Sequence, residues 1–137
     1  MKRMGEEGFT LIEVLVVCTL LGILATIAVP KFSGAVTAAN TAKIQTDLQT
    51  LDAAIVMYET ERGTEPAAIN DLGDYVADVD KLKPPTGKCR LRDGSTVSIT
   101  ATAYQIQSVS AANALDNAAA TEYRATCDGR TAGDFGR

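Results

Sequence analysis

The sequence contains no histidine and no tryptophan, and the first of these absences excludes much of enzyme chemistry. A chain without histidine has neither a Ser-His-Asp nor a Cys-His nucleophile, and it has no zinc site of the usual histidine-containing kind. The glycine patterns that bind phosphate or dinucleotides do not occur either. We therefore expect a protein that is not an enzyme and that holds no cofactor.

Aromatic residues and cysteines are few. Three Phe and four Tyr among 137 residues, with a hydrophobic content of 46%, allow one membrane segment and one small domain. Cys18 falls in an apolar run, where a thiol acts as a small hydrophobic group. Cys89 and Cys127 lie outside that run and do not have C-x-x-C spacing. They favour a disulfide over a redox pair, with two buried free thiols as the alternative.

One long apolar run is present, from Phe9 to Pro30, with Glu13 as its single charge. It predicts a helix about 32 Å long, enough to cross a hydrocarbon core of about 30 Å. A secretory signal peptide is the alternative, but its apolar region is shorter and its cleavage site lies on the far side. We expect residues 1–8 to be a leader kept on the cytoplasmic side by Lys2 and Arg3, and residues 9–30 to span the membrane.

The start of this run, GFTLIE from Gly8 to Glu13, resembles the processing site of type IV pilins and type II secretion pseudopilins. Precursors in that family carry a short polar leader that ends in glycine, then Phe-Thr-Leu-Ile-Glu and an apolar helix. The match is specific over these six residues and extends more loosely to Gly63. It implies cleavage after Gly8 by a prepilin peptidase, N-methylation of Phe9, and assembly into a helical filament with minor pilins and an inner-membrane assembly platform.

Glu13 is a carboxylate inside the apolar run. Such a group costs about 2.5–3.5 kcal/mol by insertion scales, so it needs a partner. The resemblance implies that it pairs with the amino group that cleavage creates at Phe9 of a neighbouring subunit, which makes the protein a homo-oligomer. The alternative is an interfacial side chain that reaches the lipid headgroups.

Gly22 and Pro30 interrupt the run. Glycine weakens a helix by about 1 kcal/mol relative to alanine, and proline removes one hydrogen bond of the helix. The resemblance implies that the segment between these two residues loses helicity during assembly. The alternative is that Gly22 permits close helix packing and that Pro30 marks the exit from the membrane.

Residues 31–63 change from apolar to amphipathic. Gly63 is a natural C-cap, so we expect one helix of about 80 Å from residue 9 to residue 63. A coiled coil is the rival use of its apolar face. That face is predicted by five residues that recur at steps of four and three: Ile44, Leu48, Leu51, Ile55 and Tyr58.

Residues 64–137 predict a small β-rich domain. Asp93-Gly94 between two β-prone runs predicts a hairpin with a type I′ turn, and two further strands are expected around Ile106 and Tyr123, separated by a loop over 111–120. We expect one antiparallel sheet of three or four strands against the C-terminal half of the helix, which is an α+β fold, and the resemblance implies the pilin fold. Three glycines near the C-terminus predict a flexible tail: Gly129, Gly133 and Gly136. The residues expected to cover the helix are Leu91, Val97, Ile99, Tyr104, Ile106 and Tyr123.

Two charged stretches follow the helix. The acidic one is a weak candidate for calcium, but it does not match the EF-hand pattern, and helix caps with a solvated surface are favoured. The basic one is a weak candidate for DNA contact; a pI near 4.8 argues against a general nucleic-acid surface, and a subunit contact or a solvated face is favoured. The acidic residues are Asp71, Asp74, Asp78 and Asp80, and the basic residues are Lys81, Lys83, Lys88, Arg90 and Arg92.

Taken together, the residues and the resemblance predict a structural subunit, made as a single-pass precursor in the inner membrane with its C-terminal domain outside. A major type IV pilin in an extracellular pilus is the first hypothesis. A pseudopilin of a type II secretion or DNA-uptake machine, in a periplasmic filament, is the alternative. A membrane-tethered module that binds DNA or another ligand is the third.

Overall fold

The computed structural model describes residues 8–111 and 120–136. The chain divides into two units, Met1–Ala35 and Val36–Arg137. The leader expected at residues 1–8 lies outside the described residues apart from Gly8, and so does most of the loop expected over residues 111–120.

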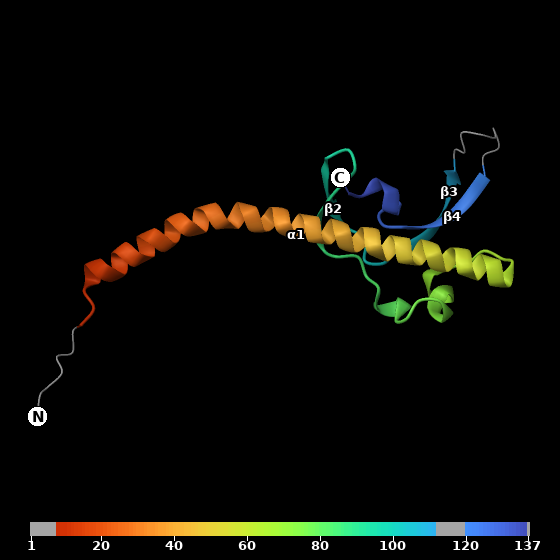
Figure 1. Ribbon diagram of the computed structural model, residues 1–137, viewed down its shortest axis with the longest axis horizontal. Coiled ribbons are helices and arrows are strands. Elements are labelled where there is room, and N and C mark those ends of the chain that lie inside the picture. The colour runs from red at the N-terminus through yellow and green to blue at the C-terminus, as the bar shows by residue number, and fades with distance from the viewer. Residues whose placement is uncertain (1–7, 112–119, 137) are drawn as a thin grey trace, which may run out of the picture. The chain divides into compact units, whose positions relative to one another are not determined.

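Helix α1 runs from Leu11 to Arg62 and has 52 residues, which confirms the long helix (Figure 1). It ends at the predicted C-cap. Gly63 has a positive φ of 66°, and its N–H donates to the carbonyl of Glu59 at 2.9 Å. Glycine is suited to this position because it has no Cβ to clash in the left-handed region.

In residues 36–111 and 120–136 the second unit contains four strands: β1 (Gly87–Arg90), β2 (Thr96–Ile99), β3 (Gln105–Ala111) and β4 (Ala120–Thr126). β1 pairs antiparallel with β2, and β3 pairs antiparallel with β4, so the four strands form two separate sheets rather than the single sheet that we expected. The ladder is not continued beyond β2, because the N–H and hydroxyl of Thr100 bind the carboxylate of Asp128 instead. The α+β fold class is confirmed.

The β1–β2 connection is a hairpin, as predicted, but its turn is longer than a two-residue type I′ turn. The N–H of Gly94 donates to the carbonyl of Leu91, and the N–H of Leu91 donates to the carbonyl of Ser95. Gly94 has a φ of 86°, whereas Asp93 does not have a positive φ. This is a type I turn closed by a left-handed glycine, the usual three-residue hairpin loop. The carboxylate of Asp93 accepts the N–H of Ser95 at 2.8 Å and supports the turn.

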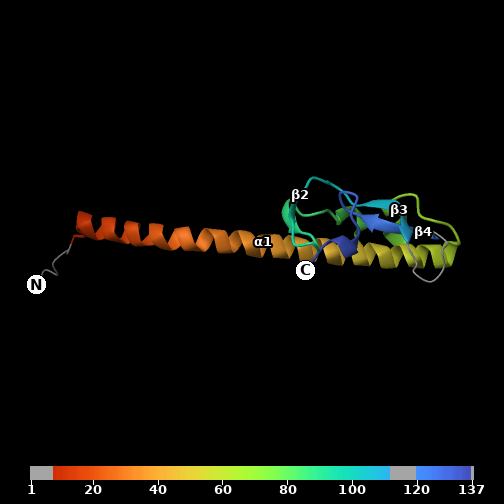
Figure 2. The same cartoon turned by 90° about the horizontal axis from the view of Figure 1, so that it is seen from above.

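The core of this unit lies on the predicted face of α1. Ile44, Leu48, Leu51 and Ile55 are at most 1% exposed, and Tyr58 packs against them. The strands and the short 3-10 helices η1 (Ile69–Asp74), η2 (Val79–Lys81) and η3 (Ala132–Asp134) cover this face, so it is not left for a coiled coil (Figure 2). Of the six covering residues that we predicted, Ile99 and Tyr104 are buried, and the other four are partly buried: Leu91, Val97, Ile106 and Tyr123.

The C-terminal segment is ordered, so the prediction of a flexible tail at Gly129, Gly133 and Gly136 is wrong. Phe135 is only 2% exposed and forms a β-bridge with Leu91. The carbonyl of Phe135 accepts a hydrogen bond from the side-chain amide of Gln45 at 2.7 Å. One aromatic side chain buried against α1 therefore fixes a segment whose glycines suggested mobility.

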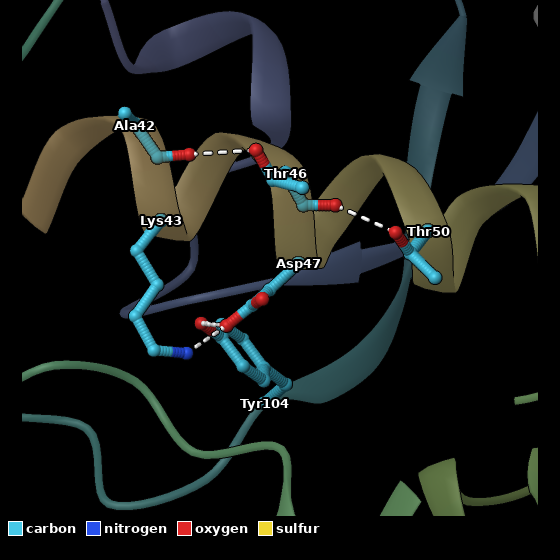
Figure 3. Close-up of polar contacts among 6 residues, drawn as sticks. All are labelled: Ala42, Lys43, Thr46, Asp47, Thr50 and Tyr104. Atoms are coloured by element: carbon cyan, nitrogen blue, oxygen red, sulfur yellow. Dashed lines mark hydrogen bonds and ion pairs between the residues drawn. The ribbon is translucent and has the colours of Figure 1, made fainter. Parts of the chain in front are cut away.

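Two carboxylates of α1 anchor the strands. The hydroxyl of Tyr104 donates to Asp47 at 2.7 Å, and Lys43 forms an ion pair with the same carboxylate (Figure 3). Burial, and then the neighbouring Asp47, raise the pKa of Tyr104 above its usual value, so it stays a neutral donor. Asp52 accepts the N–H of Ala125 on β4 at 2.8 Å.

Candidate functional site

The N-terminal unit contains the residues that the sequence marked for processing and assembly. Gly8, Phe9 and Thr10 precede α1, and all three are exposed. No atom lies within 4 Å of the position that a Cβ on Gly8 would take, and Phe9 is 81% exposed. A peptidase needs an accessible, non-helical peptide bond, and the bond between Gly8 and Phe9 meets that requirement.

The first turn of α1 is closed by Thr10 and Glu13. The N–H of Glu13 donates to the hydroxyl oxygen of Thr10 at 3.3 Å, and this hydroxyl lies 3.5 Å from the carboxylate of Glu13. Thr-x-x-Glu at a helix start is the capping-box spacing, and a carboxylate there also complements the positive end of the helix dipole. This role of Thr10 was not predicted, although its spacing to Glu13 is visible in the sequence.

The apolar run forms an exposed surface throughout the described N-terminal unit. Its large hydrophobic side chains from Phe9 to Phe32 are each 48–83% exposed. An 18-residue window of this helix has a mean hydropathy of 2.6 with none of it buried, so the helix is long and apolar enough to cross a membrane. We call the segment from Leu11 to Val29 the stem. In this unit Glu13 is the single acidic group among those apolar side chains.

Gly22 and Pro30 both lie inside α1, and the helix continues through Pro30. A proline has no N–H, so the carbonyl four residues earlier, that of Thr26, has no helical donor from Pro30. The hydroxyl of Thr26 donates in turn to the carbonyl of Gly22 at 2.9 Å. These three positions are weak points of the backbone ladder, and the loss of helicity between Gly22 and Pro30 stays a prediction.

The family model described as the prokaryotic N-terminal methylation motif matches residues 3–29, which include Gly8, Phe9 and Glu13. Over these residues the chain carries the N-terminal motif of type IV pilins and pseudopilins. The long helix followed by small antiparallel sheets agrees with the pilin fold of this family, whose members are structural rather than catalytic.

Similar members of the family share one name. The type II secretion system core protein G of Klebsiella michiganensis is 31% identical over 94 residues, which cover 69% of this chain and 65% of that protein. The protein of the same name from Vibrio cholerae is 42% identical over 73 residues, or 53% of this chain and 50% of its own length. The chain thus spans between half and two thirds of these relatives. No solved structure matches significantly.

Three of the four acidic candidates in the second unit, Asp71, Asp74 and Asp78, contact other groups of the chain. Asp71 accepts the N–H groups of Ala67 and Ala68 and caps η1. The side chains of Asp74 and Asp78 form ion pairs with Arg62 and Lys81. No group of three or more metal-ligating residues that could hold an ion occurs in residues 8–111 and 120–136. The favoured reading as caps and solvated carboxylates agrees with these contacts.

The basic candidates do not form one patch. Lys81 belongs to η2, which packs against η1, and Asp78 holds its ammonium group at 2.8 Å. Lys88 and Arg90 lie on the exposed face of β1, and Cys89 between them points to the buried face. Lys81 therefore belongs to a different part of the unit from Lys88 and Arg90. Arg92 lies in the hairpin turn, and Lys83 is exposed between η2 and β1.

Cys89 and Cys127 both lie in the core with no exposed surface, and the structure has them as free thiols. Burial raises the pKa of the Cys89 thiol and raises the pKa of Cys127 to about 11. A thiolate is the form that attacks a disulfide, so these buried thiols are poor nucleophiles once the domain has folded. The Cys89–Cys127 disulfide stays a prediction, and mass spectrometry of the exported protein under non-reducing conditions would test it.

Proposed function

We propose that the chain is the precursor of a filament subunit that acts in protein secretion. It is inserted in the inner membrane by its stem, cleaved after Gly8, methylated at Phe9 and polymerised with its second unit in the periplasm. Its partners are further copies of itself, a prepilin peptidase, minor subunits and an inner-membrane assembly platform. The filament is a structural device, and the chain is not an enzyme.

One observation carries this proposal: an exposed apolar stem with a carboxylate in its first turn, directly after an accessible Gly8-Phe9 bond. A plain membrane anchor requires neither the processing motif nor Glu13. The carboxylate is expensive at membrane depth and gains a counter-ion when a cleaved copy presents the amino group of Phe9. The names of the relatives favour a type II secretion filament over other filaments of the family.

A type IV pilus is the second candidate, because the N-terminal motif is common to both kinds of filament. Negative-stain microscopy of sheared cell surfaces, with mass analysis of the shed protein, separates the two. Long shed filaments made of this chain indicate a pilus, whereas filaments that stay with the cell envelope indicate a secretion pseudopilus.

Processing provides the direct test. Gly8→Glu places a charged side chain at the cleavage site, and we expect it to leave a full-length precursor in the membrane. Gly34→Ala is the control, since it also replaces a glycine that has no atom within 4 Å of the new Cβ but lies far from the cleavage site. Intact-mass measurement of both purified proteins reads the outcome. Mature-length protein from Gly8→Glu, or an uncleaved wild-type chain, would contradict the proposal.

A further inference from the structure

The second unit carries its two kinds of charge at different places along α1. Seven carboxylates and one arginine lie between Glu59 and Asp80, and five basic residues with no acidic residue lie between Lys81 and Arg92. We call the first group the acidic end: Glu59, Glu61, Glu65, Asp71, Asp74, Asp78 and Asp80. We call the exposed side chains of Lys88, Arg90 and Arg92 the cationic hairpin.

Contacts with α1 place the two groups. The N–H of Arg90 donates to the hydroxyl of Thr41 at 2.8 Å, so the cationic hairpin lies beside the first turns of α1 in this unit. Arg62, the last residue of α1, pairs with Asp74 of the acidic end at 2.9 Å. Thr41 and Arg62 are separated by about 30 Å along a helix that rises about 1.5 Å per residue. The hairpin and the green segment that holds η1 lie beside different stretches of α1 (Figure 1).

Among the described residues, the side chains of the cationic hairpin have no ion-pair partner. Lys43, Arg62, Lys81 and Arg124 each form an ion pair, but in the described ranges 8–111 and 120–136 the side chains of the hairpin form none. A separation of about 30 Å exceeds the Debye length of about 8 Å at physiological salt, so the acidic end of the same copy does not neutralise the hairpin.

We propose that the cationic hairpin of one copy binds the acidic end of a second copy of this chain. This inference rests on the proposed function, because stems inserted through one membrane give all copies the same orientation. An antiparallel dimer is then excluded, and copies in exact lateral register would place like charges together. A contact between unlike ends is heterologous, and a heterologous contact that does not close into a ring produces an open helical filament.

The composition of the chain favours this occupant over an anionic polymer. A net charge of −4 repels a phosphate backbone at long range, whereas a second copy presents the seven carboxylates of the acidic end. Paired in this way, the two groups also set the axial stagger between neighbours, in addition to the Glu13 pair. Such exposed pairs determine register and discriminate against wrong alignments more than they add affinity.

Charge reversal in the full-length chain tests the contact. Lys88→Glu/Arg90→Glu should lower the yield of filaments at least about tenfold at low salt, because like charges facing each other across an interface cost several kcal/mol. Glu61→Lys/Asp80→Lys should do the same, and the four substitutions combined should restore the yield to within about threefold of wild type. Lys81→Glu/Lys83→Glu is the control. It changes the net charge as much as the hairpin variant does, but its residues lie outside the cationic hairpin, next to the acidic end.

Folding and function are separated from the contact by further measurements. Thermal unfolding followed by circular dichroism checks that each variant folds, and Lys88→Gln/Arg90→Gln, which removes charge without reversing it, should give an intermediate yield. Normal filament yield from the hairpin reversal would overturn the contact while leaving the proposed function intact. Uncleaved or unassembled wild-type protein would instead overturn the proposed function.

The contact would also be overturned if Lys88→Glu/Arg90→Glu lowers the filament yield and adding Glu61→Lys/Asp80→Lys does not restore it. Wild-type protein retained by vesicles containing phosphatidylglycerol, but not by phosphatidylcholine vesicles, would then assign the hairpin to the lipid surface. Retention on double-stranded DNA would assign it to nucleic acid.

Discussion

Asp52 shows how a single side chain joins helix and strand in the second unit. Its carboxylate accepts the N–H of Ala125, which is fully buried, and lies 3.4 Å from the guanidinium of Arg124. Burial raises the pKa of Asp52 above its usual value, the Ala125 hydrogen bond and Arg124 oppose this shift, and Glu122 adds to it. We therefore expect the hydrogen-bond acceptor at position 52 to contribute more to the stability of the fold than its negative charge does.

Replacing Asp52 with asparagine or alanine separates these two requirements. Asp52→Asn keeps a carbonyl oxygen for the N–H of Ala125, so we expect a small change in the free energy of unfolding. Asp52→Ala leaves that buried N–H unpaired and should cost about 1–3 kcal/mol. Urea unfolding at pH 7 measures both variants. Equal losses in the two variants would show that the charge, through Arg124, is what matters.

The pH dependence of Asp52 follows from the direction of its pKa shift. Because the folded pKa is raised, the folded chain binds the proton of Asp52 more tightly than the unfolded chain does, so this contribution to stability is lost as pH rises above 3.8. The difference in unfolding free energy between wild type and Asp52→Asn should therefore fall as pH rises from 3.8 through the folded pKa. A difference that grows with pH over this range would contradict the assignment.

At the scale of elements, the C-terminal segment decides how the hairpin is held. Phe135 bridges to Leu91, the N–H of Arg92 donates to the carbonyl of Asp134 at 2.9 Å, and the N–H of Gly136 donates to the carbonyl of Arg90 at 3.2 Å. The segment from 132 to 136 is thus an extra support for β1 and its turn, and through Gln45 it is also tied to α1.

Phe135→Ala should therefore destabilise the second unit by about 3–5 kcal/mol, the usual cost of truncating a buried phenylalanine. The stem is not involved, so membrane insertion and cleavage should be unchanged. Urea unfolding measures the loss, and limited proteolysis should show cleavage first in the β1–β2 hairpin. Arg92→Ala, which keeps the backbone bond to Asp134, is the control. A stability loss below about 1 kcal/mol in Phe135→Ala would mean that the C-terminal segment contributes little to the stability of the second unit.

The same segment marks the limit of what the sequence predicted. The α1 helix and its buried face were predicted because apolar residues at steps of three and four leave little choice of structure over so long a range. The C-terminal segment was missed because three glycines suggest mobility and one phenylalanine does not have a periodic pattern. The split into two sheets was also missed, since it depends on Thr100 binding Asp128, a contact between residues distant in sequence.

The candidate site was predicted for a different reason. Gly8, Phe9 and Glu13 were identified by a local motif, and the family match over residues 3–29 includes all three. Their roles depend on a second copy, so a single chain shows the exposed groups but not the pairing. The capping role of Thr10 is local information as well, because it follows from the spacing of Thr10 to Glu13.

At the scale of the whole molecule, Glu13 has two roles, one in the helix start and one in assembly, that experiments must separate. Within one chain it completes the helix start with Thr10. Between chains it would neutralise the amino group of Phe9 on a neighbour. The first duty concerns a helix of 52 residues, for which the loss of one cap matters little, whereas the second concerns every subunit added to the filament.

Two variants separate these duties. Thr10→Ala removes the cap at a cost of about 1 kcal/mol but leaves the carboxylate, so filament yield should stay near wild type. Glu13→Ala should be inserted and cleaved normally, as it makes the stem more apolar, yet assemble poorly because each new subunit would bring an unpaired cation into an apolar surround. Intact mass checks cleavage, and quantitative microscopy of filaments checks assembly. Equal yields from both variants would mean that register is set elsewhere, with the cationic hairpin and the acidic end as the next groups to test.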